Sequence, residues 1–146
     1  MFSTILIVCV GNICRSPMAE GILQKALISA GKTECSVSSA GLGALAGHEA
    51  DPTARQLMTD RGLDISSHRA RQLTDDMLHQ ADLILVMEAW QKAVIETRTP
   101  SAKGKVFRFG EWEGIDISDP YQKDRSEFIR SVTLIEQSAA QWITRL

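Results

Sequence analysis

The sequence is short of cysteine, of aromatic residues and of net charge. Its three cysteines, Cys9, Cys14 and Cys35, form neither an even disulfide framework nor a zinc-ligand spacing with the histidines, which is typical of the reducing cytoplasm. The net charge of -2 gives no general attraction to nucleic acid or to an anionic membrane. The apolar run from Ile5 to Val10 is too short to span a bilayer, and it lacks the pattern of a secretion signal. We therefore expect a cytoplasmic protein that binds no nucleic acid and inserts into no membrane.

The length of 146 residues fits one compact domain that spans residues 1–146. A chain of this size buries roughly two thirds of the surface that its unfolded form exposes. The sequence contains no internal repeat, low-complexity tract or linker. We therefore expect a single domain and not a repeat array.

Apolar residues follow two periods along the chain. Continuous aliphatic runs are typical of parallel strands that are covered on both faces, and apolar residues three or four positions apart are typical of helices. The predicted strands span residues 5–8, 35–40, 83–87 and 106–109. The predicted helices span residues 17–30, 52–61, 74–78, 89–95 and 124–146, the last opened by Asp124 and Glu127 in a capping box. The apolar stripe of this last helix should pack on the sheet; it consists of Phe128, Val132, Ile135, Ala139, Trp142 and Leu146.

This alternation predicts an α/β fold with a four-stranded parallel sheet, right-handed crossovers and helices on both faces. Ligands bind at the carboxyl ends of the strands in such sheets. The loop of residues 9–16 lies there, directly after the first strand. A second loop, residues 41–47, should be mobile because of its glycine content.

The segment CVGNICRS places a thiol and a guanidinium on either side of five residues whose N–H groups can curl inward. Gly11 and Asn12 tolerate positive φ, and the helix that follows directs its positive end toward the same point. The planar guanidinium of Arg15 can bind two phosphate oxygens at once. The loop is therefore expected to bind phosphate through Val10, Gly11, Asn12, Ile13, Cys14, Arg15 and Ser16.

The same electrostatic field favours the thiolate form of Cys9, which makes it a candidate nucleophile. The hydroxyl of Ser16 could donate a hydrogen bond to this sulfur and stabilise it as a leaving group. A plainer interpretation makes Cys9 a buried core residue and Arg15 a solvated helix residue. The spacing Cys-x5-Arg-Ser between a strand and a helix favours catalysis.

The segment CVGNICRSPMAE resembles the active-site loop of the low-molecular-weight protein tyrosine phosphatases. SSAG, SHRARQ and DPY follow in the order and spacing of that family, so the resemblance extends across nearly the whole chain. GLGALAG with EADPTA most resembles its bacterial branch, which is linked to capsule and exopolysaccharide production. The resemblance implies a two-step reaction through a phosphocysteine, with no metal or other cofactor.

The resemblance also implies roles for residues outside the loop. Asp119, in the segment DPY, resembles the general acid, although Asp-Pro alone is typical of a turn. Tyr121 resembles an aromatic wall of the substrate pocket, and we choose Leu45 for the opposite wall. Many relatives carry an aromatic residue on that second side, and a packed loop is the alternative for Leu45.

Three further residues have supporting roles by resemblance. Ser39 and His68 match positions that hold Asn12 by hydrogen bonds. Cys14 could form a reversible disulfide with oxidised Cys9, or it could simply fill space behind the loop.

Other functions share parts of this pattern. An arsenate reductase needs further cysteines for its disulfide relay, and a protein arginine phosphatase resembles a loop with threonine in place of Ile13. A non-catalytic phosphoprotein-binding module would need no acid such as Asp119. We expect a monomeric phosphatase whose partner is a membrane tyrosine kinase of polysaccharide export, with a phosphorylated tyrosine-rich tail.

Overall fold

A four-stranded parallel sheet forms the centre of the protein, as a computed structural model describes it for residues 2–146. The strand order is β2-β1-β3-β4, and all three pairings are parallel. The predicted fold class is therefore confirmed. The strands are β1 (Thr4–Cys9), β2 (Ser36–Gly41), β3 (Leu83–Val86) and β4 (Val106–Arg108).

The register of the strands brings their carboxyl ends to one edge of the sheet. Cys9 at the end of β1 pairs with Gly41 at the end of β2, and Val8 pairs with Val86 at the end of β3. The loops that follow these three strands therefore begin side by side.

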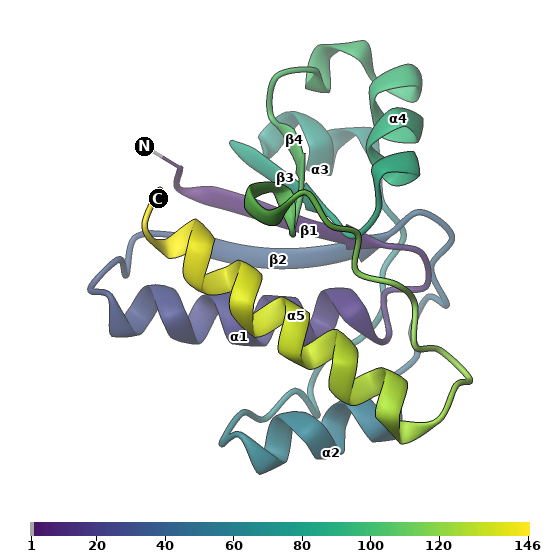
Figure 1. The fold of residues 1–146 in the computed structure, drawn as a ribbon. Helices are drawn as coiled ribbons and strands as arrows, with labels where there is room; N and C mark the ends of the chain where they lie inside the picture. The colour runs from purple at the N-terminus through teal and green to yellow at the C-terminus, as the bar shows by residue number, and fades with distance from the viewer. Residues whose placement is uncertain (1) are drawn as a thin grey trace.

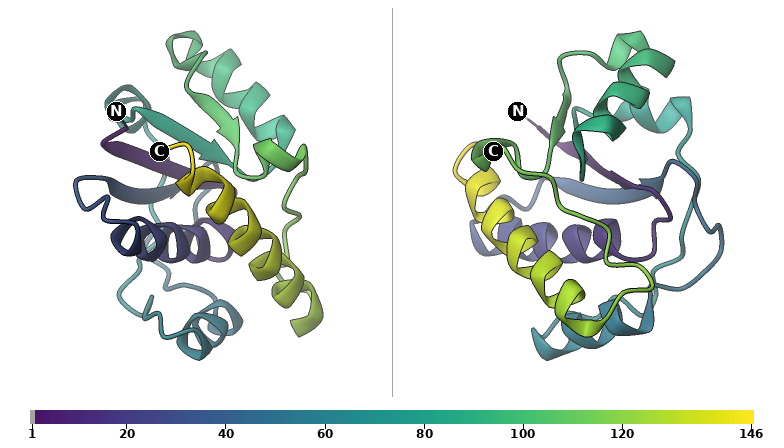
Figure 2. Two further views of the ribbon diagram at one scale, coloured as in Figure 1. Left: turned by 60° about the vertical axis from the view of Figure 1, so that its left-hand side comes forward. Right: turned by 45° about the vertical axis from the view of Figure 1, so that its right-hand side comes forward.

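The helices cover both faces of the sheet (Figure 1). Helices α1, α2 and α5 lie together on one face and α3 and α4 lie on the other, an arrangement that both views of Figure 2 repeat. The helices are α1 (Arg15–Ser29), α2 (Pro52–Asp60), α3 (Asp75–Gln80), α4 (Ala89–Arg98) and α5 (Arg125–Ile143), with single 3-10 turns η1 (Pro100–Ala102) and η2 (Glu111–Glu113).

The apolar stripe of α5 is buried as predicted, through Phe128, Val132, Ile135, Ala139 and Trp142. It packs against α1 and the sheet, and the indole N–H of Trp142 donates to the carbonyl of Phe109 at 2.8 Å. Burial of a large apolar side chain contributes about 1.5–3 kcal/mol. Leu146 lies beyond the end of the helix and is half-buried against the same core.

Two helix starts differ from the predictions. Helix α1 begins at Arg15 and not at Pro17. The N–H groups of the first turn of a helix have no partner within the helix, so a proline is tolerated at any position of this turn and does not mark the first residue. The predicted capping box of α5 is wrong: the carboxylate of Asp124 accepts from the hydroxyl of Ser126 at 2.7 Å and caps no backbone N–H.

The other helix boundaries follow the sequence more closely. The carboxylate of Asp51 caps α2 by accepting from the N–H of Thr53 at 2.8 Å, and the hydroxyl of Thr74 caps α3. Helices α3 and α4 run two and three residues further than predicted, since their last residues are mainly polar and continue no apolar stripe. No helix within residues 2–146 is long and apolar enough to cross a membrane.

Candidate active site

The loop between β1 and α1 curls around the sulfur of Cys9. Asn12 adopts a left-handed conformation with φ 60, and its N–H points at the sulfur of Cys9 at 3.3 Å. Of the two residues in the loop that tolerate positive φ, Gly11 and Asn12, only Asn12 adopts it. The turn directs the loop backbone toward the thiol.

The strained turn at Asn12 is fixed by hydrogen bonds from four other residues. Its side-chain N–H2 donates to the hydroxyls of Ser16 at 2.7 Å and Ser39 at 3.0 Å, and its side-chain oxygen accepts from the N–H of Arg71 at 2.9 Å. The backbone carbonyl of Asn12 lies 2.7 Å from Nε2 of His68, which must donate because a carbonyl only accepts. Asn12 is completely buried, and its bonds to Ser16 and Ser39 are shielded from water.

A chain of donors ends at the sulfur of Cys9. The hydroxyl oxygen of Ser16 lies 2.9 Å from this sulfur and accepts from the side chain of Asn12. Since the oxygen already accepts one hydrogen, its own hydrogen is free to point at the sulfur. This orientation stabilises negative charge on Cys9.

The guanidinium of Arg15 is buried beside the loop, with 2% of its side chain exposed. Its Nη1 donates to a carboxylate oxygen of Glu88 at 2.6 Å and to the carbonyl of Ile117 at 2.7 Å, while Nη2 lies 3.6 Å from the carboxylate of Asp119. Its Nε has no hydrogen-bond partner within residues 2–146. Buried polar groups are nearly always paired, so this N–H is suited to an oxyanion in the pocket.

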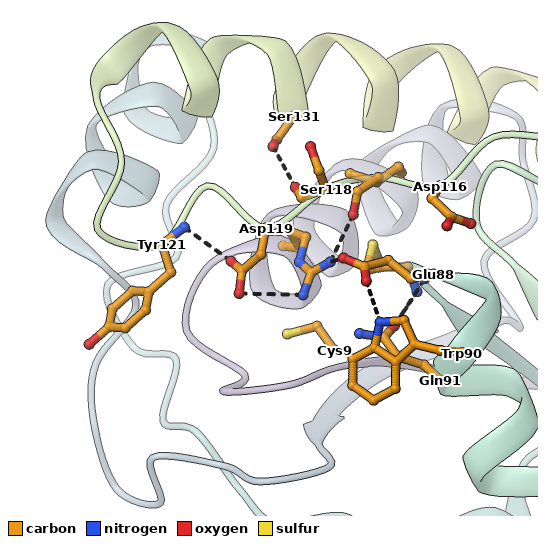
Figure 3. Close-up of polar contacts among 12 residues, drawn as sticks. Cys9, Glu88, Trp90, Gln91, Asp116, Ser118, Asp119, Tyr121 and Ser131 are labelled. Carbon is orange, nitrogen blue, oxygen red and sulfur yellow. Dashed lines mark hydrogen bonds and ion pairs between the residues drawn. The ribbon is translucent and has the colours of Figure 1, made fainter.

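Asp119 lies on the segment between β4 and α5, with 43% of its side chain exposed. One carboxylate oxygen accepts from the N–H of Tyr121 at 3.0 Å, which orders a local turn. The segment is fixed to the protein by the N–H of Ile117, which donates to the carbonyl of Met87 at 2.9 Å. Figure 3 shows Cys9, Glu88 and Asp119 around one space, with Tyr121 further out.

A cavity of about 150 Å³ opens over the sulfur. Leu45 and Tyr121 are both partly exposed at its rim. Phosphate would enter between the loop, the guanidinium and the carboxylate of Asp119. The cavity is lined by Cys9, Val10, Gly11, Ile13, Cys14, Arg15, Gly43, Leu45, Asp119 and Tyr121.

The residues of this site match a known family. A sequence model described as low molecular weight phosphotyrosine protein phosphatase matches residues 4–146. The chain belongs to this family. The predicted family and enzyme class are confirmed: the protein is a protein tyrosine phosphatase.

Bacterial relatives of the phosphatase match it over nearly their whole length. A probable low molecular weight protein-tyrosine-phosphatase EpsP of Ralstonia solanacearum is 49% identical over 100% of this chain and 97% of its own. Wzb of Escherichia coli K12 is 45% identical over the same shares. The solved structure of Vibrio vulnificus Wzb in complex with benzylphosphonate is 39% identical, with a TM-score of 0.93 and complete coverage of both chains.

The loop that carries Leu45 is bound to the phosphate loop of the phosphatase. The N–H groups of Leu42, Gly43 and Leu45 donate to the carbonyls of residues 9, 10 and 11 at 2.9–3.0 Å. Gly41 precedes them, and a Cβ there would lie 2.4 Å from the carbonyl oxygen of Val10. These contacts restrain the loop, whereas its glycine content alone predicts a mobile loop.

All three cysteines of the phosphatase are free and buried. Burial raises the pKa of the Cys14 thiol far above its ordinary value, and the carboxylates of Asp51 and Asp119 raise it further. This shift keeps Cys14 protonated and slows any attack on an oxidised Cys9. The disulfide between them stays a prediction. The thiol of Cys35 donates to the carbonyl of Phe2 at 3.1 Å and takes no part in the site.

Glu88 and Arg71 take part in the site, although no sequence motif marks them. Glu88 lies two residues after the end of β3, and this place at the carboxyl edge of the sheet is the signal by which it could be identified. Arg71 contributes its backbone N–H to Asn12, and a backbone contact leaves no trace in residue type. Within residues 2–146, no group of three or more His, Cys, Asp and Glu side chains is placed to hold a metal ion.

Proposed function

We propose that the phosphatase hydrolyses phosphotyrosine in proteins through a phosphocysteine at Cys9, with Arg15 binding the phosphate and Asp119 transferring the protons. The observation that carries the proposal is the buried, unpaired Nε of Arg15, a residue that lines the same cavity as Cys9. An oxyanion would pair this N–H and the inward-facing amides of the loop together. A ligand without an acceptor oxygen would leave this N–H without a partner.

In the first step, the thiolate of Cys9 attacks phosphorus and the bond from phosphorus to the tyrosine oxygen breaks. The electron pair of that bond goes to the phenolate oxygen, which takes a proton from Asp119. Arg15 and the loop amides hold the equatorial oxygens, where negative charge is spread in the transition state. General acid catalysis of this kind contributes about 10²–10⁴ in rate.

In the second step, a water molecule attacks phosphorus and gives a proton to the carboxylate of Asp119. The phosphorus–sulfur bond breaks, its electron pair returns to Cys9, and inorganic phosphate leaves. The hydroxyl of Ser16, 2.9 Å from the sulfur, stabilises the departing thiolate. Asp119 is protonated again and ready for the next cycle.

The order of events can be tested by rapid quenching and intact mass spectrometry with an aryl phosphate. We expect a phosphorylated enzyme whose label maps to Cys9, and no turnover in Cys9→Ser. The matched thiol variants Cys14→Ser and Cys35→Ser should keep a phosphoenzyme. Turnover without any covalent phosphate on Cys9 would refute the mechanism.

The role of Asp119 is tested by the leaving group. Asp119→Ala should lose about 10²–10⁴ in kcat with phosphotyrosine, whose phenolate needs a proton. It should lose much less with a nitrophenyl phosphate, whose leaving group is stable as an anion. An equal loss with both substrates would exclude Asp119 as the acid.

The substrate ring would lie between Leu45 and Tyr121 at the rim of the pocket. An aromatic ring against Tyr121 would gain stacking energy. Parallel assays with phosphotyrosine, phosphoarginine and arsenate separate the tyrosine phosphatase from the two enzymatic alternatives. Binding of phosphopeptide without hydrolysis would favour the binding module.

For the partner, we propose a membrane tyrosine kinase of polysaccharide export, since GLGALAG with EADPTA resembles the bacterial branch of the family that is linked to capsule and exopolysaccharide production. The three free thiols favour the cytoplasm as the place of reaction. The trapping variant Asp119→Ala should recover a tyrosine-phosphorylated kinase from cells. Recovery of no phosphotyrosine protein would count against this partner.

A further inference from the structure

Two short backbone segments together hold the guanidinium of Arg15. One contains Met87, Glu88 and Ala89, where β3 leads into α4, and the other contains Asp116 and Ile117. Glu88 accepts from Nη1 of Arg15 through its carboxylate, and Ile117 accepts from the same nitrogen through its carbonyl. The position of the guanidinium therefore depends on the distance between the two segments.

Asp116 joins these segments next to the points where they bind Arg15. Its carboxylate oxygen Oδ1 accepts from the N–H of Ala89 at 3.1 Å and from Arg108 at 3.1 Å. The contacts close a ring from Arg15 through Glu88, Ala89, Asp116 and Ile117 back to Arg15. Figure 3 shows Asp116 beside Glu88 at the start of α4.

We propose that Asp116 is a positioning residue, which sets the guanidinium of Arg15 for phosphate by fixing the two segments that bind it. This inference rests on the proposed role of Arg15 in phosphate binding. The contact between the N–H of Ala89 and the carboxylate does the positioning, because it reaches the segment that carries Glu88, whereas Arg108 lies outside both segments. A second contact between the segments, from the N–H of Ile117 to the carbonyl of Met87, stays in any Asp116 variant. Loss of Asp116 therefore weakens phosphate binding without abolishing it.

The test measures competitive inhibition by inorganic phosphate, together with kcat, KM and Tm. Asp116→Ala should raise the inhibition constant of phosphate and KM about three- to tenfold, the value of one ordinary hydrogen bond, since this one is exposed. Asp116→Asn keeps an acceptor oxygen and should recover most of this affinity. Glu113→Ala removes an exposed carboxylate from the same segment between β4 and α5 and serves as the matched control. We expect it to leave the inhibition constant of phosphate unchanged.

A second variant removes the donor and leaves Asp116 in place. Ala89 is the first residue of α4, where proline is well tolerated, and Glu88 before it has φ -135 and ψ 151, which proline requires of its predecessor. Ala89→Pro should therefore fold and raise the phosphate inhibition constant as Asp116→Ala does. If either folded variant binds phosphate like the wild type, the inference is wrong.

The Arg15→Lys background separates positioning from general damage. If Asp116 acts through the guanidinium, Asp116→Ala should add little to the effect of Arg15→Lys. A full additional loss of affinity in the double variant would overturn the inference. If Arg15→Lys alone leaves the inhibition constant of phosphate unchanged, the proposed role of Arg15 itself is wrong. If Arg15→Lys raises this constant and Asp116→Ala does not, only the positioning role of Asp116 is refuted.

Discussion

Replacement of Asn12 by alanine and, separately, by glycine measures what holds the phosphate loop in shape. Either change removes the hydrogen bonds of the side chain to Ser16, Ser39 and the N–H of Arg71. At about 1 kcal/mol each, these bonds contribute about 3 kcal/mol to the free energy of unfolding. Alanine at φ 60 adds a strain of about 1–2 kcal/mol that glycine avoids.

Glycine has a cost of its own, because it makes the unfolded chain more flexible by about 0.5–1 kcal/mol. We therefore expect Asn12→Ala to lose about 4–5 kcal/mol and Asn12→Gly about 3.5–4 kcal/mol, out of the 5–15 kcal/mol typical of a domain. Urea unfolding followed by tryptophan fluorescence gives both values, and kcat/KM should fall in both variants.

The two outcomes that refute this reasoning are distinct. Asn12→Ala more stable than Asn12→Gly by about 0.5–1 kcal/mol would show that the left-handed turn carries no strain, because only the flexibility of glycine in the unfolded chain would then separate them. A loss below about 1 kcal/mol in both variants would show that the buried hydrogen bonds contribute little. Ser39→Ala, which removes one of the three bonds and the bond that the hydroxyl of Ser39 donates to Glu20 at 2.6 Å, serves as an intermediate control with a loss of about 2 kcal/mol.

Three further predictions concern other parts of the protein. Since burial raises the pKa of Cys14, iodoacetamide at neutral pH should leave this thiol unmodified until urea unfolds the protein; peptide mapping that finds Cys14 alkylated in the folded state would contradict this. Hydrogen bonds from the N–H of Thr4 and from Ser3 lower the pKa of Asp82 in the folded protein. The ionised carboxylate therefore stabilises the fold at any pH above the ordinary pKa of about 3.9, and this contribution is lost as the pH falls through the lower pKa of the folded state. Asp82→Asn should therefore be less stable than the wild type in urea at pH 7, and the two should converge in acid; a difference that persists in acid would refute the assignment. Gly41→Ala places a methyl group 2.4 Å from the carbonyl of Val10 and should lower the free energy of unfolding by more than about 2 kcal/mol, whereas a near-neutral result would show that the loop shifts freely.

The fold and the shape of the loop of residues 9–16 could be predicted because their determinants are local. The aliphatic run before Cys9 specifies a covered strand, and the short segment from Cys9 to Arg15 places the thiol and the guanidinium between this strand and α1. Alternation of strands and helices then leaves few topologies, and the parallel sheet follows. Resemblance added Asp119, which lies more than a hundred residues away in the sequence.

The contacts that hold Arg15 could not be predicted in the same way. Glu88 and the carbonyl of Ile117 meet the guanidinium only after β3 and the segment before α5 are placed side by side. The carbonyl is a backbone group, so no residue type reveals it. Residue type alone also does not show which residue of the loop adopts positive φ. Gly11 permits it, but Asn12 adopts it.

Two segments far apart in the sequence meet in one cavity, with Cys9 at the end of the first strand and Asp119 on the segment before the last helix. A ribosome therefore synthesises the proposed nucleophile long before the proposed acid. The segment of Asp119 leads into α5, which packs on α1. On the proposed mechanism, full turnover of phosphotyrosine would begin only once this late segment is in place, so that catalytic activity would report its folding.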